Sequence, residues 1–466
     1  MKNVAKVFVV SCGLVFSASA LATSEDSAQY FHNKVAEQQI PLGEIALKNK
    51  DYAKAYEIFK PVAENGNKIA EYQLGYLYQN GFGVEKNIEQ AVNWYTRAYE
   101  QGLPDAGYAL GALHYYGVGV QQSLPDAITL YTKAAEANNP LAEYMLGTLN
   151  SNGFGVNKDL SAAASWYEKA AMQGEGQAQY NLGLTYYSGQ NITQDYAKAL
   201  TLFNAAAQQG LAKAQFMLGL MYSVGQGIPM DKNQAFYWYT QSAQQGLAVA
   251  QYNLGIMYYN GQGTAVNLNQ AITWVNKAAA QGLSRAQYFI GYLTYNGIGF
   301  TKDAQQSLNW YTKSAQQGLA DAQFALGFIY HNGMGVQKDD KQAFAWYSAA
   351  AKQGFANAEY MMGLFYQQGA GVIADPRTAA VWYSKAAEQG MDNAQLMLGS
   401  MYAQGQGIQA DNKMAYVWLN LASTSSNSQI RDAALKMRDA VAKNMTPQDV
   451  NVATQMSQTY YSKYAK

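Results

Sequence analysis

The stretch AQYNLGIMYYNGQG, residues Ala250 to Gly263, decides the fold because it recurs along the chain. Its Leu-Gly pair has a counterpart every 36 residues, ten times in all and without an insertion. The pairs are Leu74-Gly75, Leu110-Gly111, Leu146-Gly147, Leu182-Gly183, Leu218-Gly219, Leu254-Gly255, Ile290-Gly291, Leu326-Gly327, Met362-Gly363 and Leu398-Gly399. Self-similarity at a fixed period of this length is the signature of a solenoid of stacked repeats.

Each repeat is predicted to be a pair of helices. The apolar residues of the quoted stretch recur at helical spacing, at Ala250, Leu254, Met257 and Tyr258. A second apolar stripe follows at Ala271, Trp274 and Ala278. A loop of about seven residues that contains Gly-x-Gly joins the two helices. One 36-residue unit cannot bury its own stripe, so neighbouring units are expected to stack into a continuous core.

The Gly261-x-Gly263 motif could be half of a phosphate-binding loop, because bare backbone N–H groups converge at such turns. The repeat argues otherwise. Asn191 replaces the second glycine once, and Asn138 replaces a glycine of the repeat end. Asparagine is the residue that best tolerates the left-handed conformation after glycine. The pattern therefore predicts helix ends and turns, and neither a preceding strand nor a P-loop lysine supports nucleotide binding.

A glycine inside each first helix, such as Gly255, costs about 1 kcal/mol relative to alanine. Its recurrence predicts close approach of the paired helix, and we expect an alanine column of the second helix to supply the facing surface. All eight tryptophans share another column, where Leu130 and Leu202 fill two gaps. A column that accepts leucine is expected to be an apolar packing site.

A polar column precedes every second helix: Asn87, Ser123, Asp159, Asp195, Asp231, Asn267, Asp303, Asp339, Asp375 and Asp411. An array of carboxylates could bind calcium. All ten residues, however, are good N-caps, whose side-chain oxygen accepts a hydrogen bond from an otherwise unpaired backbone N–H. The presence of asparagine and serine in the column favours capping over a metal site, and we expect neither a metal nor a cofactor.

The N-terminal residues resemble a secretory signal peptide, with Lys2 and Lys6 before an apolar run and small residues up to Ala22. We expect cleavage after Ala22 and a periplasmic or secreted protein. Cys12 lies inside this segment, and too few apolar residues precede it to favour a lipoprotein. Cleavage would leave a mature chain without cysteine. No later segment is long and apolar enough to predict an integral membrane span.

Charge and composition argue against several function classes. Lys+Arg and Asp+Glu are balanced at 32 each, so no basic face for nucleic acid is indicated. The histidines His32, His114 and His331 occupy unrelated repeat positions and show no metal-ligand spacing. His114 is expected to be a packed core or rim residue. Without a G-x-S-x-G motif, no hydrolase site is predicted, and we expect the protein not to be an enzyme.

The pattern A-x-Y-x-L-G-x-M-Y-x-x-G-x-G-V…D…A-x-x-W-Y-x-K-A-A-x-Q-G resembles the Sel-one-like repeat (SLR) family of the tetratricopeptide-repeat superfamily. It is clearest over residues 322–354, AQFALGFIYHNGMGVQKDDKQAFAWYSAAAKQG. The resemblance implies an all-α, right-handed superhelical solenoid whose first helices line the concave side. We predict a signal peptide over 1–22, a tetratricopeptide-like cap over 23–66, ten repeats over 67–426 and a C-terminal helical cap over 427–466.

The resemblance also implies a scaffold that binds a protein or peptide partner in its concave groove, in the cell envelope, in signalling or in host contact. Binding residues are sought where the repeat varies on the first helix. The candidates are Tyr76, Tyr115, Tyr116, Tyr187, Tyr259, Tyr292, Tyr295, Phe328 and His331. Tyrosine supplies contact area together with a polar tip. Part of this set is also expected to line the stack between repeats.

Two other functions remain open. Tyrosine together with Asn80, Asn152, Asn260, Asn296 and Asn332 would also suit a periplasmic binder of peptidoglycan or other glycan fragments, although Asn-Gly is also ordinary helix-end chemistry. Cysteine-rich members of the resembled family have been described as binding or weakly hydrolysing β-lactams. This chain departs from them, because it lacks repeat cysteines, S-x-x-K and K-T-G. A β-lactam-interacting hydrolase is therefore the weakest alternative.

Overall fold

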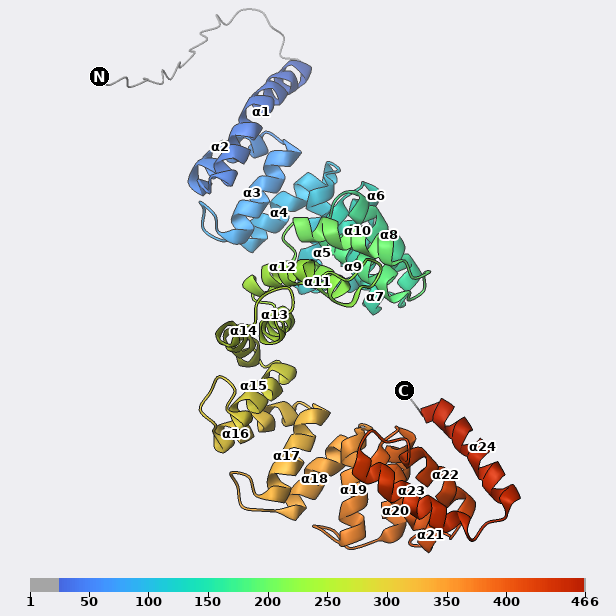
Figure 1. The fold of residues 1–466 in the computed structure, drawn as a ribbon. Helices are drawn as coiled ribbons and strands as arrows, with labels where there is room; N and C mark the ends of the chain where they lie inside the picture. Colours follow the sequence, from blue (N-terminus) through green and yellow to red (C-terminus); the bar gives the residue numbers. More distant parts are fainter. Residues whose placement is uncertain (1–24, 465–466) are drawn as a thin grey trace, which may run out of the picture. The chain divides into compact units, whose positions relative to one another are not determined.

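The computed structural model describes residues 25–464, which form 24 helices and no strand (Figure 1). The chain divides into two compact units, Met1–Gln209 and Gly210–Lys466. The helices of the first unit are α1 Glu25–Lys48, α2 Tyr52–Glu64, α3 Lys68–Asn80, α4 Ile88–Glu100, α5 Pro104–Tyr116, α6 Leu124–Glu136, α7 Pro140–Asn152, α8 Leu160–Met172, α9 Gly176–Ser188 and α10 Tyr196–Gln208.

The second unit continues the same succession of helices. They are α11 Ala212–Val224, α12 Lys232–Gln244, α13 Ala248–Asn260, α14 Leu268–Ala280, α15 Ser284–Asn296, α16 Ala304–Gln316, α17 Ala320–Asn332, α18 Asp340–Ala351, α19 Ala356–Gln368, α20 Pro376–Glu388, α21 Asp392–Gln404, α22 Asn412–Ala422, α23 Ser428–Ala442 and α24 Pro447–Tyr464. Within each unit, the helices of a repeat pack on each other and each second helix packs on the first helix that follows. The predicted all-α solenoid of helix pairs is confirmed.

Capping residues and left-handed turns set the helix limits. Helix α13 ends at Gly261, which has φ 67°, and α14 begins after Asn267, whose side-chain oxygen accepts a hydrogen bond from Gln270 N at 2.9 Å. All ten members of the polar column accept such a bond. Asn138 and Asn191 have φ 59° and 61°. The prediction that the polar column caps the second helices is confirmed. The prediction that the two asparagines adopt the left-handed conformation is also confirmed.

The second glycine of the loop has a packing role that the sequence did not reveal. A Cβ on Gly263 would lie 2.2 Å from the carbonyl oxygen of Lys232, at the start of α12. Gly371 and Gly407 meet the backbone of the preceding second helix in the same way. The first glycine of the motif therefore ends a helix, and the second lets the loop lie against the neighbouring repeat.

The glycine inside each first helix faces an aromatic ring in most repeats, and this corrects the expectation of an alanine surface. A Cβ on Gly327 would lie 2.5 Å from Cδ1 of Tyr347, which is fully buried. Val275 takes the place of the ring opposite Gly255, and Leu419 does so opposite Gly399. The predicted close approach of the two helices is confirmed. The group that leaves no room for a Cβ, however, is the side chain one helical turn after the alanine of the second helix.

Amide side chains join successive repeats in what we call the glutamine ladder. In the second unit, Gln281 Nε2 donates to Gln251 Oε1 at 2.8 Å and to the carbonyl oxygen of Gly246 at 2.9 Å. Gln251 Nε2 in turn donates to the carbonyl oxygen of Ala243 in the preceding repeat at 3.2 Å. The side-chain pairs, each within one repeat, are Gln101–Glu71, Gln173–Glu143, Gln209–Gln179, Gln245–Gln215, Gln281–Gln251, Gln317–Gln287, Gln353–Gln323 and Gln389–Glu359.

The tryptophan column makes contacts between repeats, as a packing site should. Trp274 of α14 lies against the core formed by α12 and α13, which includes Ala243 and Leu254. Its outer face is half-buried and carries the ammonium of Lys277 at 4.1 Å from the ring centroid. Cations lie over the rings of Trp94, Trp166, Trp310 and Trp382 in the same way.

The two ends of the described chain are closed by helices outside the repeat. Helix α1 packs on α2, whose cap Asp51 accepts from Lys54 N at 3.4 Å. At the other end α23 and α24 pack on α22, and Tyr460 meets Trp418 edge-on at 5.4 Å. Residues 1–22 lie outside the described residues, so the signal peptide remains a prediction, as do the four segment boundaries.

Candidate functional site

The structure places the candidate binding residues on six first helices. Those of the first unit are Tyr76 on α3, Tyr115 and Tyr116 on α5, and Tyr187 on α9. Those of the second unit are Tyr259 on α13, Tyr292 and Tyr295 on α15, and Phe328 and His331 on α17. The two groups belong to different compact units of the chain.

The candidates of the first unit form separate pairs. Tyr115 and Tyr116 meet edge-on at 4.8 Å, and Tyr116 is 67% exposed. Tyr76 meets Phe82 of the following loop at 5.9 Å. Tyr187 lies 5.4 Å from Tyr196. Tyr116 is thus the most open aromatic surface among these four.

The second unit brings Tyr259 and Tyr292 together through a residue that the sequence analysis missed. The ring of Phe289 lies edge-on to Tyr259 at 5.2 Å and nearly parallel to Tyr292 at 6.1 Å. The ring of Tyr252 also lies edge-on to Phe289, at 6.4 Å. We call Tyr252, Tyr259, Phe289 and Tyr292 the α13–α15 aromatic cluster. Phe289 stands in a column that also holds Gln73, Ala109, Met145 and Asn181, so its variability was the signal that could have revealed it.

The cluster is open on one side and polar at its margin. Tyr292 is 38% exposed, whereas Tyr252, Tyr259 and Phe289 are half-buried. Burial raises the pKa of Tyr252, and the guanidinium of Arg285 lowers it in part. The hydroxyl group of Tyr252 therefore remains neutral at physiological pH. Together the rings of the cluster offer apolar area with hydroxyl tips, which suits recognition of a side chain or a sugar face.

Most of the other candidates of the second unit contact neighbouring residues of the solenoid. Tyr295 Oη donates to Met334 Sδ at 2.6 Å. His331 packs on Phe365 at 5.1 Å, and its Nδ1 lies 2.7 Å from Asp340 Oδ1. Phe328 remains 42% exposed. Of these three residues, Phe328 alone offers a large accessible apolar surface.

The loop-proximal asparagines serve their own helices. Asn296 Nδ2 donates to the carbonyl oxygen of Tyr292 at 2.8 Å, and Asn332 does the same to Phe328. Asn80 and Asn152 make the equivalent bonds. These amides therefore complete helix C-termini, which weakens the expectation that they bind a glycan.

Among the described residues, no three His, Cys, Asp or Glu side chains gather in a way that could hold a metal ion. No described helix has the length and apolarity needed to cross a membrane. His114 is half-buried, and its Nδ1 has no hydrogen-bond partner among the described residues. Burial also raises the pKa of Tyr72 to about 12, so that hydroxyl is not a nucleophile at neutral pH.

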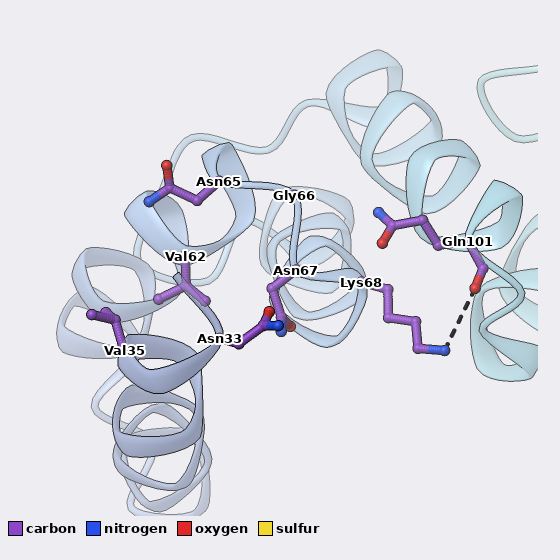
Figure 2. A pocket seen from close by; sticks show the side chains of 8 residues that line it. All are labelled: Asn33, Val35, Val62, Asn65, Gly66, Asn67, Lys68 and Gln101. Atoms are coloured by element: carbon purple, nitrogen blue, oxygen red, sulfur yellow. Dashed lines mark hydrogen bonds between the residues drawn. The ribbon is translucent and has the colours of Figure 1, made fainter. Parts of the chain in front are cut away.

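A polar pocket of about 250 Å³ lies near the start of the solenoid, between α1, the α2–α3 turn and the end of α4 (Figure 2). Its lining is Asn33, Val35, Val62, Asn65, Gly66, Asn67, Lys68 and Gln101. The side chain of Asn67 caps α3, and Lys68 Nζ reaches the carbonyl oxygen of Gln101 at 3.5 Å (Figure 2). These groups are engaged in structural bonds, so the pocket provides a weaker case for a ligand than the aromatic cluster.

Comparison with known proteins agrees with this geometry. The family model of the Sel1 repeat matches ten consecutive segments: 68–103, 104–139, 140–175, 176–211, 212–247, 248–283, 284–319, 320–355, 356–391 and 392–427. The chain belongs to the Sel1 repeat family. Sel1 repeats are generally non-enzymatic scaffolds for protein–protein interaction, and family membership indicates protein partners at that level.

Solved structures of Sel1 repeat proteins resemble the chain as well. A protective antigen of uropathogenic Escherichia coli strains with an SLR fold is 34% identical, with 95% of each chain covered and a TM-score of 0.80. A Sel1 repeat protein from Oxalobacter formigenes is 33% identical, covering 52% of this chain and 99% of its own, with a TM-score of 0.48. A search of the curated proteins gave no match.

Proposed function

We propose that this Sel1 repeat protein is an exported, non-enzymatic scaffold that binds a protein partner on the first-helix face of its second unit. The observation that carries the proposal is the α13–α15 aromatic cluster, where three tyrosine rings from two consecutive first helices contact Phe289. Aromatic residues in a partly desolvated patch are the side chains most often responsible for binding energy at protein interfaces.

The cluster has the properties of a docking surface for a peptide segment. Tyr292 and Phe328 are exposed on successive first helices, so the apolar surface can be followed from α15 to α17. Arg285 and Asp321 contribute charges of opposite sign near the tyrosines. A partner can therefore combine apolar contacts with polar contacts at the margin, as protein interfaces commonly do.

A capture experiment tests this proposal. The chain from Thr23 onward would be immobilised and exposed to an envelope extract of its native host. We expect a discrete protein to be retained, and its retention to fall at least tenfold with Tyr259→Ala or Tyr292→Ser. Tyr237→Ser is the matched control, because Tyr237 is 51% exposed but lies on a second helix.

Other results would redirect or refute the proposal. Retention of muropeptides alone would favour the periplasmic glycan-fragment binder instead of the scaffold. Equal capture by all three variants would exclude the aromatic cluster as the binding surface. Saturable β-lactam turnover by the purified chain would contradict the non-enzymatic part of the proposal.

A further inference from the structure

An apolar pocket of about 470 Å³ opens in the first unit, between α8, α9 and α10. Ala171, Leu182, Tyr186 and Leu202 form its apolar lining. The side chain of Met172 stands at its edge and is 79% exposed. The pocket lies on other helices than the α13–α15 aromatic cluster and belongs to the other unit, so the inference below does not rest on the proposed function.

The pocket exists where the repeat lacks its tryptophan. Leu202 occupies the tryptophan column and, like Trp274 in its own repeat, packs against the core of the two preceding helices. Leu182, Ala171 and Tyr186 stand at the repeat positions of Leu254, Ala243 and Tyr258, which belong to the same cluster as Trp274. The residues that line the pocket therefore occupy the repeat positions that pack against an indole ring elsewhere in the same molecule.

At Leu130, the other leucine of the tryptophan column, a side chain of the protein itself fills the space of the missing indole. Leu130 packs beside Tyr99, a large side chain at the repeat position that Ala171 occupies two repeats later. Every other repeat also has a small residue at this position, namely Ala135, Ala207, Ala243, Ala279, Ala315, Ala351, Ala387 and Ser423. Tyr99 thus compensates for the missing indole at Leu130, whereas nothing of that size accompanies Leu202.

The charges around the pocket favour a ligand that brings a cation together with the ring. Five tryptophans carry a Lys or Arg three residues later, at 4.1 to 4.5 Å from the ring centroid. That position after Leu202 is Ala205. The rim supplies the carboxylate of Glu168, the only acidic residue in a column of Thr, Ser and Asn. Lys198, which also lines the pocket, places its ammonium group 4.9 Å from the ring centroid of Tyr186.

We propose that this pocket receives a tryptophan side chain of a protein partner, with a basic residue of the partner close to Glu168. The apolar walls bury the indole, as the same repeat positions do for Trp274. Glu168 pairs with the cation, which restores the ring-and-cation arrangement that the neighbouring repeats build internally. An indole in such a pocket is the kind of anchor on which protein interfaces depend most.

Peptide binding to the full chain tests the proposal directly. The probe is acetyl-Trp-Ala-Ala-Lys-amide with 5-fluorotryptophan, followed by ¹⁹F NMR line width during titration. We expect saturable binding by the wild type, at least tenfold weaker binding of the Leu-Ala-Ala-Lys analogue in competition, and about threefold weaker binding of the Trp-Ala-Ala-Glu analogue. Glu168→Lys should remove or reverse the preference for lysine over glutamate.

Two variants that fill the pocket provide the decisive comparison. Leu202→Trp restores the missing indole and Ala171→Tyr copies the solution seen at Tyr99, so each should weaken probe binding at least tenfold. Leu130→Ala is the matched control in the same column and should leave binding unchanged. Glu168→Lys alters only the exposed rim, so it keeps the test meaningful if a filled variant does not fold. Absence of saturable binding by the wild type, or equal binding by the folded filled variants, would overturn the proposal.

Discussion

The carboxyl group of Glu143 occupies a place in the glutamine ladder that most repeats fill with an amide. It is 1% exposed, and its Oε2 accepts a hydrogen bond from Gln173 at 2.8 Å. Burial raises its pKa above the usual value. Because the folded pKa lies above the unfolded one, stability is greatest below the unfolded pKa and falls as the pH rises through the folded pKa.

Glu143→Gln should therefore stabilise the protein at pH 7, where the buried carboxylate is disfavoured, and have little effect near pH 4. Urea unfolding at the two pH values measures this difference. Glu71→Gln is the informative contrast, because Glu71 has an ion pair with Arg97 at 2.8 Å whose loss would offset the gain. An unchanged midpoint for Glu143→Gln at pH 7 would contradict the electrostatic argument.

A second prediction concerns the glycine inside a first helix. Gly327→Ala gains helix propensity of about 1 kcal/mol, but its Cβ would lie 2.5 Å from the ring of Tyr347. Overpacking of this kind costs about 1–3 kcal/mol, so net destabilisation is expected. In a double-mutant cycle measured by thermal unfolding, Tyr347→Ala should abolish most of the penalty of the alanine. Additive effects would show that the ring is not its cause.

Among the elements, the second helices depend on their caps. Asp231 Oδ1 accepts from the backbone N–H groups of Asn233 and Gln234 at 2.9 and 3.1 Å. Asp231→Ala should cost about 1 kcal/mol, whereas Asp231→Asn should be nearly neutral, because asparagine caps the equivalent helices at Asn87 and Asn267. Denaturant unfolding of the three proteins would reveal the order, and an alanine variant as stable as wild type would refute it.

The tryptophan column gives a prediction at the level of a helix interface. Trp274→Leu should reproduce beside α12 and α13 the arrangement found at Leu202, because Ala243 and Leu254 repeat the positions of Ala171 and Leu182. Loss of the indole should destabilise the protein by about 2–4 kcal/mol. The fluorinated peptide should then show a second binding site. A single site in the folded variant would mean that the column alone does not create the pocket.

At the level of elements, the periodicity was enough to predict the helix pairs, their caps and their left-handed ends. The second loop glycine and the glutamine ladder were missed, because their roles depend on which atoms of another repeat lie opposite. The candidate site could be predicted only in part for the same reason, because it depends on contacts between repeats. Variable columns pointed to Tyr259 and Tyr292 as candidates, but only the stacked helices reveal Phe289 between them.

For the whole molecule, nearest-neighbour contacts should make the repeat a removable unit. Deletion of residues 247–282 would join equivalent positions of two repeats, so a shorter folded protein is expected. Deletion of 18 residues from Leu247 would remove α13 and part of the loop that follows it, and would leave the apolar stripe of α14 uncovered. Far-UV circular dichroism and limited proteolysis distinguish the two. Equal unfolding of both variants would show that the stack is not built from independent neighbours.

The direction in which each tryptophan points has a consequence for synthesis. Trp274 and Trp310 lie against helices that precede them in the chain. Through these two tryptophans, a nascent repeat therefore meets a docking surface that precedes it in the chain. This arrangement favours vectorial assembly from the N-terminus, with short-lived exposure of each apolar stripe. A truncated nascent chain should then fold up to its last complete repeat, which arrest peptides placed at successive 36-residue intervals would record as evenly spaced folding events.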